Sequence, residues 1–327
     1  NSFYRLFKAD PNFVKTIINE RMLRRTAEDY LNETFPKLIK NNLNVELKDE
    51  HKEVYMQVYE NEYVNPGLKL NQLIYASIDP NLVNPNLLSK KLASKIGNLK
   101  SSVYNSIDDL IQKIVDSDGK VLLFSDLKVG IIDPLKERYS KYNANIITGD
   151  VSSDNFNGEL SVREERRKKF QDNPDCKMLI STSVMDEGVD LTAATDIIHL
   201  TLPYTSKTFD QRNRRSQRIG EIDKEQVNVH TVKPMVSCGT STITEGIENL
   251  LNDKRRIITY IMDSPELLTK QDLKEIKNGN KTGSKHLKPL LRSPIQNISK
   301  HMGQLKGKGF IHIEKHYNEW SEIAKNI

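Results

Sequence analysis

The chain has 327 residues, enough for about two domains and a large buried core. Hydrophobic residues make up 37% of it and charged residues 28%, and no stretch approaches the roughly 18 consecutive apolar residues of a membrane-spanning helix. Lysine and arginine number 49 against 44 aspartates and glutamates, and the net charge of +5 does not by itself indicate a nucleic-acid partner. We therefore expect a soluble globular protein with no membrane partner.

The two cysteines give no sign of a disulfide framework or of a zinc site. Cys176 and Cys238 lie far apart, and neither has a further cysteine or a histidine at metal-ligand spacing. A reducing, intracellular compartment fits this pattern best. Residue 1 is Asn and no apolar run follows it, so we expect no signal peptide and expect the chain to begin inside a longer product.

Hydrophobic periodicity predicts an alternation of helices and strands from about residue 107 onward. A helical face formed by Ile107, Leu110, Ile111, Ile114 and Val115 ends in a turn at 116–119. We then expect strands at 120–125, 144–148, 178–181, 196–200 and 227–232. Helices are expected at 127–142, 163–170, 207–219 and 243–261, and Pro134 is a point where the first of them can break. This order predicts an α/β fold with a mostly parallel sheet, helices on both faces and ligands at the carboxyl ends of the strands.

Texture and charge divide the chain into three expected regions. These are a helical linker region at 1–118, the α/β domain at 119–262 and a basic extension at 263–327. Between residues 276 and 313 there are eight basic and no acidic residues, so this segment carries +8 and the rest of the chain −3. Composition alone leaves open whether it is a solvated tail or an arm that contacts phosphates; the candidate DNA-binding lysines in it are Lys277, Lys281, Lys285, Lys306 and Lys308.

The first candidate site lies on the helix expected at 207–219. Arg215 and Arg218 are three residues apart and so share a helical face. Two neighbouring guanidinium groups repel each other unless an anion such as a nucleotide triphosphate lies between them. A solvated basic face that pairs with nearby carboxylates is about equally compatible with this spacing.

The second candidate site begins at the carboxyl end of the strand expected at 178–181. Hydroxyls and free backbone N–H groups at Ser181 and Thr182 could hold phosphate oxygens, Gly188 permits a tight turn, and Asp190 could accept a hydrogen bond from a sugar hydroxyl. Taken alone, the Gly-Val-Asp-Leu sequence is more typical of an ordinary loop.

Taken together, the motifs resemble the second RecA-like lobe of superfamily-two helicases, and most closely the Swi/Snf-type DNA-translocating ATPases. Motif four of that family resembles the segment 121–126, motif five resembles 181–191, and motif six, Gln-x-x-x-Arg-x-x-Arg-x-Gly, is matched by Gln211, Arg215, Arg218 and Gly220. The resemblance covers roughly residues 15 to 262. Its upstream part looks like the segment by which such proteins leave their first lobe.

The resemblance implies a role for each matched residue. Arg215 and Arg218 would act as arginine fingers on ATP, with Gln211 orienting the nucleotide; Gly188, Asp190 and Gly220 would belong to the nucleotide-binding part. Backbone phosphates of DNA would be contacted by Ser125, Ser181 and Thr182. The phosphate-binding motif Gly-x-x-x-x-Gly-Lys-Ser/Thr occurs nowhere in the 327 residues, so we expect ATP and Mg²⁺ to be held mainly by a first RecA-like lobe of the same polypeptide, and this chain alone to be inactive.

The sequence thus predicts an intracellular, DNA-associated ATP-dependent translocase on double-stranded DNA, of which this chain is the second motor lobe. Two alternatives remain open at this stage. One is a non-catalytic RecA-like interaction or scaffold module, which would have no use for paired arginines facing a nucleotide. The other is a strand-separating helicase, because both kinds of motor use the same lobe.

Overall fold

The computed structural model describes residues 16–17, 36–61, 66–152, 160–182, 190–217, 224–237, 240–249 and 251–252. The chain falls into two compact units, one formed by 33–58 and 72–245 and the other by 1–32, 59–71 and 246–327. Within the ranges just given, no helix combines the length and the apolar character that crossing a bilayer requires. The sheet and the candidate site lie in the first unit.

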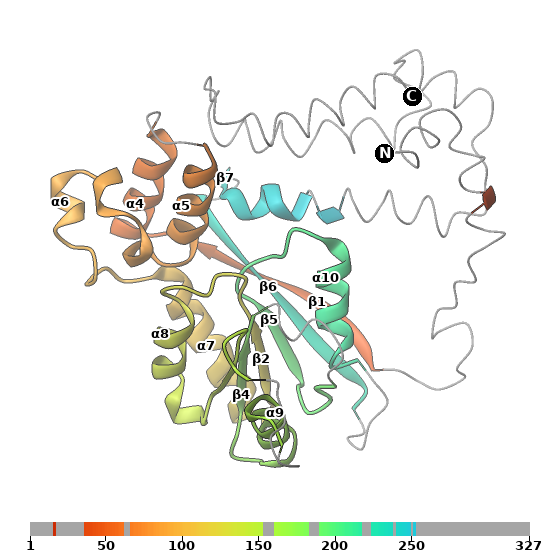
Figure 1. Cartoon of the computed structure of the whole chain (residues 1–327). Helices are drawn as coiled ribbons and strands as arrows, with labels where there is room; N and C mark the ends of the chain where they lie inside the picture. Colours follow the sequence, from red (N-terminus) through yellow and green to blue (C-terminus); the bar gives the residue numbers. More distant parts are fainter. Residues whose placement is uncertain are drawn as a thin grey trace. The chain divides into compact units, whose positions relative to one another are not determined.

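A seven-stranded sheet organises the larger unit (Figure 1), and six of its strands run parallel in the order β1-β6-β5-β2-β4-β3. The short β7 pairs antiparallel with β6. The strands are β1 (Lys37–Glu46), β2 (Val121–Phe124), β3 (Asn145–Ile147), β4 (Met178–Ser181), β5 (Asp196–His199), β6 (Gln226–Ser237) and β7 (Thr240–Ser241). All residues of β2, β4 and β5 are buried, as expected for the centre of a parallel sheet covered on both faces.

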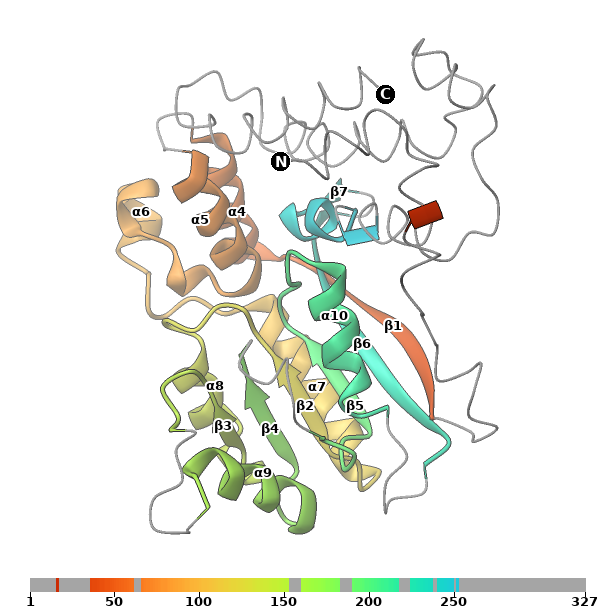
Figure 2. The ribbon, with the colours of Figure 1, turned by 45° about the vertical axis from the view of Figure 1, so that its right-hand side comes forward.

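The helices between the strands cover the two faces of the sheet. In Figure 2, α10 lies in front of the sheet and α7 lies behind it. Right-handed crossovers then place α8 on the face of α7 and α9 on the face of α10. The bounds are α7 (Ser102–Asp116), α8 (Ile132–Arg138), the 3₁₀ turn η3 (Ser140–Tyr142), α9 (Val162–Asp172) and α10 (Ser206–Arg214). The predicted α/β fold with a mostly parallel sheet and helices on both faces is confirmed.

One strand was not expected. The segment 37–46 lies in the region predicted to be helical, yet β1 pairs with β6 in parallel over ten residues, from Lys37 opposite Gln226 to Glu46 opposite Met235. Leu43, Val45 and Leu47 alternate along it, and the last two of these are buried. Asn41, Asn42 and Asn44 lie in the same strand and lower its apparent strand propensity, so the period-two signal was missed.

Between β1 and α7, the regular elements among the described residues are helices. They are α4 (Asp49–Glu60), α5 (Pro66–Ile78), α6 (Lys90–Ala93) and the 3₁₀ turns η1 (Pro80–Leu82) and η2 (Pro85–Leu87). His51 ties this region to α7, because one ring nitrogen accepts the Ser102 N–H at 3.0 Å while the other donates to the Ala76 carbonyl at 2.8 Å. Both bonds require the neutral imidazole.

The expected helix at 127–142 is shorter in the structure. Residues 127–131 form a turn in which Gly130 has φ +76°, and α8 begins only at Ile132. Pro134 does not break α8, because it lies in the first turn, where a backbone N–H has no partner within the helix. The structure thus moves the start of the helix rather than interrupting it.

The described part of the smaller unit holds one buried cation. Lys69 is 1% exposed; its Nζ donates to the Asn61 carbonyl at 2.8 Å and lies 5.9 Å from the centre of the Tyr59 ring. A hydrogen bond together with a cation–π contact offsets part of the cost of burying the charge.

Candidate functional site

The carboxyl ends of three central strands meet at one edge of the sheet. Phe124, the last residue of β2, lies opposite Ser181 on β4 and His199 on β5. The Ser125 N–H donates to the Ser181 carbonyl at 3.0 Å. The structure therefore brings the segments predicted as motifs four and five side by side, as their places in a parallel sheet require.

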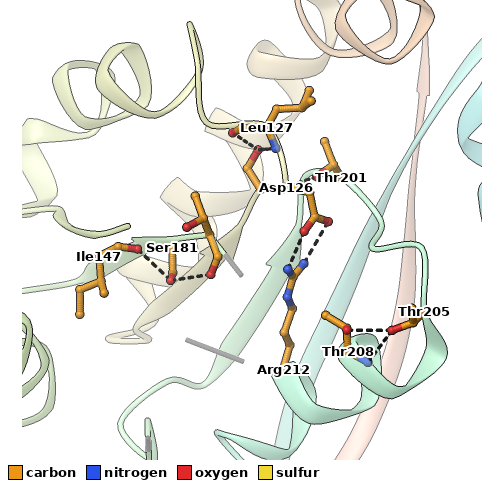
Figure 3. Close-up of polar contacts among 10 residues, drawn as sticks. Asp126, Leu127, Ile147, Ser181, Thr201, Thr205, Thr208 and Arg212 are labelled. Carbon is orange, nitrogen blue, oxygen red and sulfur yellow. Dashed lines mark hydrogen bonds and ion pairs between the residues drawn. The ribbon is translucent and has the colours of Figure 1, made fainter. Parts of the chain in front are cut away.

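The two serine hydroxyls predicted to touch DNA are turned inward. Both side chains are 0% exposed. The Ser125 hydroxyl donates to the Leu127 carbonyl at 2.9 Å, and the Ser181 hydroxyl lies 3.0 Å from the Ile147 carbonyl (Figure 3). In this arrangement both hydroxyls hold the loops that follow β2 and β4. Contact with DNA through them would require these loops to open, and it stays a prediction.

Thr182 and Asp190 border the part of motif five that the structure describes. Thr182 is 6% exposed and its N–H donates to the Ile147 carbonyl at 3.3 Å. Asp190 is exposed, and its backbone carbonyl accepts a bond of 3.5 Å from Arg167. Of the two, only Asp190 presents its side chain to a ligand from solution.

The helix of motif six has a clear start and an early end. Thr205 caps α10, since its hydroxyl accepts the Thr208 N–H at 3.2 Å (Figure 3). The helix ends at Arg214 rather than near 219, because the Arg215 and Ser216 N–H groups donate to carbonyls only three residues back, at 3.2 and 3.4 Å. Just after the helix, the Arg215 carbonyl accepts the Leu191 N–H at 2.9 Å. That bond joins motif six to motif five.

The predicted nucleotide-binding side chains lie at or beside this junction. Gln211 is half-buried on α10, and Arg215 follows the helix with 7% of its surface exposed. Arg218, Gly188 and Gly220 lie outside the described residues. So do the basic residues of the segment 276–313, that is Lys277, Lys281, Lys285, Lys306 and Lys308.

An ion pair at the same edge was missed in the sequence. Arg212 is 0% exposed and reaches Asp126 with both terminal nitrogens, at 2.6 and 3.2 Å (Figure 3). Its guanidinium carbon lies 4.9 Å from the centre of the Phe124 ring. Asp126 directly follows Ser125, so the pair links motif four to motif six. The partners are 86 positions apart in the sequence, so no local pattern indicates the pairing.

A buried histidine lies next to this pair. His199 is stacked between the rings of Phe124 and Phe209, and its Nε2 lies 2.8 Å from Oδ1 of Asn213. Burial is the main cause that lowers the pKa of His199 to about 3; the nearby Arg212 lowers it further, and the bond to Asn213 partly opposes the shift. Among the described residues, His199 Nδ1 and Asn213 Nδ2 have no hydrogen-bond partner. The neutral imidazole is therefore the form present at pH 7.

The arginines of α9 are engaged within the domain. Arg163 donates to the Val151 carbonyl at 2.9 Å and Arg166 to the Ile146 carbonyl at 2.7 Å. Arg167 pairs with Glu164 at 2.5 Å, one helical turn away. These contacts support the loops around β3 rather than an anion site.

The described residues offer no cluster of three metal-ligating side chains. A carboxylate cluster of the kind that holds Mg²⁺ in phosphoryl-transfer sites is thus not found in this part of the chain.

Comparison with known proteins agrees with this geometry. Residues 103–220 match the family described as the helicase conserved C-terminal domain. An uncharacterised ATP-dependent helicase of Mycoplasma genitalium is 26% identical over 269 residues, which make up 79% of this chain and 23% of that protein.

Two solved structures have a similar fold. One is the C-terminal part of the Fun30 ATPase domain, with 16% identity, 66% of this chain and 89% of that chain covered, and a TM-score of 0.52. The other is the SWI2/SNF2 ATPase core of Sulfolobus solfataricus in complex with double-stranded DNA, with 22% identity, 77% and 52% covered, and a TM-score of 0.50.

Residues 103–220 therefore match the helicase conserved C-terminal domain, and the RecA-like α/β fold is similar to that of the C-terminal part of the Fun30 ATPase domain and of the SWI2/SNF2 ATPase core. The resemblance read from motifs four, five and six is confirmed, since all three lie within 103–220. The chain spans about a quarter of the length of the Mycoplasma relative.

Proposed function

We propose that this chain is the second lobe of an ATP-dependent motor that translocates on double-stranded DNA. The observation that carries the proposal is that backbone hydrogen bonds connect the three motifs in series. The Ser125 N–H of motif four donates to the Ser181 carbonyl, and the Leu191 N–H of motif five donates to the Arg215 carbonyl of motif six. The first of these bonds lies at the carboxyl ends of the strands, where ligands bind in open α/β sheets.

The nucleotide would lie between this chain and a first RecA-like lobe that supplies the phosphate-binding loop and any Mg²⁺. Arg215 and Arg218 would stabilise the negative charge that develops on the transferred phosphoryl group, and Gln211 would orient the nucleotide. Asp190, which is exposed, would contact the ribose or couple the nucleotide to DNA. Since Arg215 is only 7% exposed, its side chain must turn outward when the lobes close.

DNA would be held through its backbone, without base readout. We assign Ser125 and Ser181 to holding the strand-end loops, because their hydroxyls are buried and bonded. The phosphate contacts themselves would come from the lysines of the segment 276–313. Thr182 is only 6% exposed, so its contact with phosphate would require the loop after β4 to open. Alternate closing and opening of the two lobes would then move the duplex.

The test uses the motor that contains this chain together with its ATP-binding lobe. ATP hydrolysis is measured without nucleic acid, then with double-stranded DNA, single-stranded DNA and RNA. The proposal expects the largest stimulation by double-stranded DNA and ATP-dependent displacement of the third strand from a triplex. Equal stimulation by all three nucleic acids, or no displacement, would contradict it.

Strand separation is the second candidate function, because the Mycoplasma relative carries the name helicase. A forked duplex with a labelled strand distinguishes the two. A translocase displaces the triplex strand and leaves the fork intact, whereas a helicase separates the fork. Absence of hydrolysis in the presence of the first lobe would favour the scaffold alternative instead.

A further inference from the structure

The ion pair between Asp126 and Arg212 joins the loop after β2 to α10 at the carboxyl ends of the strands. We infer that these two residues form a positioning pair that sets the place of Arg215 for phosphoryl transfer. The inference rests on the proposed function. It gives a role to two side chains to which the motif resemblance assigns none.

The geometry of the pair fixes α10 in orientation as well as in distance. Two parallel bonds, of 2.6 and 3.2 Å, hold a planar guanidinium against a planar carboxylate, and this fork tolerates little rotation. Asp126 is itself anchored, because its N–H donates to the Thr201 hydroxyl at 2.7 Å. On the other side, Arg212 lies against the face of Phe124.

The orientation of Arg212 is passed to Arg215 through the backbone. The Arg215 N–H donates to the Arg212 carbonyl at 3.2 Å, so the two residues belong to the same turn. From there the chain continues to motif five through the bond between the Arg215 carbonyl and Leu191. A displacement of the fork therefore moves the arginine finger, and a misplacement of about 1 Å can cost about 10²-fold in rate.

Stability alone is a poor reason for this pair. Arg212 is fully buried, and burying a guanidinium costs free energy that a well-packed apolar pair would not. Other contacts already hold α10 on the sheet: Phe209 stacks on His199, and His199 is bonded to Asn213. What a charged fork adds, and an apolar pair lacks, is a defined orientation.

The experiment compares single and double variants in the motor that contains this chain. Asp126→Asn and Arg212→Lys each remove the bidentate pairing while keeping size and polarity. We expect kcat to fall about 10- to 100-fold, with KM for ATP and the Kd for DNA within about threefold of the unsubstituted motor. The double variant Asp126→Leu with Arg212→Met should recover the unfolding midpoint, because no unpaired charge remains, yet stay at least about tenfold slow.

Lys120→Met is the matched control. Lys120 is a partly buried cation at the opposite edge of the same sheet, where its Nζ donates to the Phe170 and Asn173 carbonyls. It should lower the unfolding midpoint and leave kcat unchanged. A comparable loss of kcat in this control would overturn the inference, since general destabilisation would then explain the slow pair variants.

Three further outcomes would overturn it. These are single variants with unchanged kcat, a double variant that recovers kcat along with stability, and slow pair variants combined with an Arg215→Ala variant of full activity. The last of these, or a motor without hydrolysis, also contradicts the proposed function. Full-speed pair variants beside an inactive Arg215→Ala contradict the positioning role alone.

Discussion

At the amino ends of the strands, two half-buried lysines bind backbone carbonyls. Lys120 holds the end of α9, and Lys224 donates to the Thr192 and Ala194 carbonyls at 2.6 and 2.7 Å. At the carboxyl ends, the corresponding contacts join side chains. Arg212 binds Asp126, and two buried polar atoms beside this pair have no partner among the described residues.

The difference separates contacts that serve stability from contacts that serve a ligand. A cation on a carbonyl closes a loop and leaves little polar capacity unused, whereas unsatisfied buried polar atoms cost free energy and persist where something else is gained. Motif four and the start of motif five lie at the carboxyl edge, whereas the bond between Leu191 and Arg215 lies towards the amino edge, next to the Thr192 carbonyl that Lys224 binds. We therefore expect substitutions at Gly119 and Lys120 to change stability and those in the motifs to change rate.

Substitution of Arg215 should have the largest effect on kcat and directly tests whether the motif residues determine the rate. In the motor with both lobes, Arg215→Ala should lower kcat for ATP hydrolysis by about 10³-fold, as the loss of an arginine finger does. Arg214→Ala, next to it and exposed, is the control and should keep its rate. A variant that hydrolyses ATP normally but unfolds more easily would make Arg215 a structural residue.

Gly119 tests close packing at the amino edge. A Cβ there would lie 2.6 Å from Ile114 Cγ2, 2.7 Å from Thr195 Oγ1 and 2.9 Å from the Ile114 carbonyl. Gly119→Ala should lower the free energy of unfolding by about 3 kcal/mol, measured by urea titration. We expect kcat at temperatures below the unfolding transition to stay unchanged. A variant with a lower kcat but normal stability would contradict the expectation that this position affects stability alone.

Lys120→Met should have a smaller effect of the same kind. Losing the bonds to the carbonyls at the end of α9 should cost about 2 kcal/mol of unfolding free energy, since bonds from a charged donor contribute more than neutral ones. Faster amide hydrogen exchange in α9, without a change in kcat, is the measurement. Unaltered exchange would show that the cation does not stabilise this helix end.

Acid should weaken the protein through two buried histidines. Burial lowers the pKa of His51 to about 4, an effect that the bond to Ala76 partly opposes, and the pKa of His199 to about 3, against 6.5 in the unfolded chain. The unfolded chain therefore binds more protons as pH falls below 6.5, and the stability present above that pH is lost. From pH 7 to 5.5, each histidine should account for a loss of about 1 kcal/mol.

His51→Gln and His199→Gln separate the two contributions. Each variant is unfolded in urea at both pH values, and the difference in unfolding free energy between them should shrink by about 1 kcal/mol relative to the unsubstituted protein. Only the pH dependence is compared, since each substitution also changes packing. A variant with the full acid loss would show that its histidine is already protonated in the folded state.

Much of the sheet was predictable because its signals are local. Apolar runs placed β2, β4 and β5 within one or two residues, and the helical face around Ile107 placed α7. The end of α10 was not predictable, because the Arg215 and Ser216 N–H groups turn to carbonyls three residues back at a point that no Gly, Pro or change of periodicity marks.

The candidate site was predictable only where a motif names it. Motif spacing led to Gln211, Arg215 and Asp190, and in the fold a hydrogen bond between the Leu191 N–H and the Arg215 carbonyl joins their segments. Motif spacing did not indicate Asp126 and Arg212, because an ion pair between residues 86 positions apart leaves no periodicity. The burial of the Ser125 hydroxyl was not visible in the sequence either, because the residue type at a strand end does not fix its exposure.

The pairing of β1 with β6 has a consequence for the time course of synthesis. Lys37 pairs with Gln226 and Glu46 with Met235, so the ribosome adds roughly 190 residues between the two strands. At about 5 to 20 residues per second, β1 leaves the ribosome about 10 to 40 seconds before its neighbour exists. For that interval its ten backbone positions are open to chaperones and to other nascent chains, and the sheet closes only when β6 has emerged.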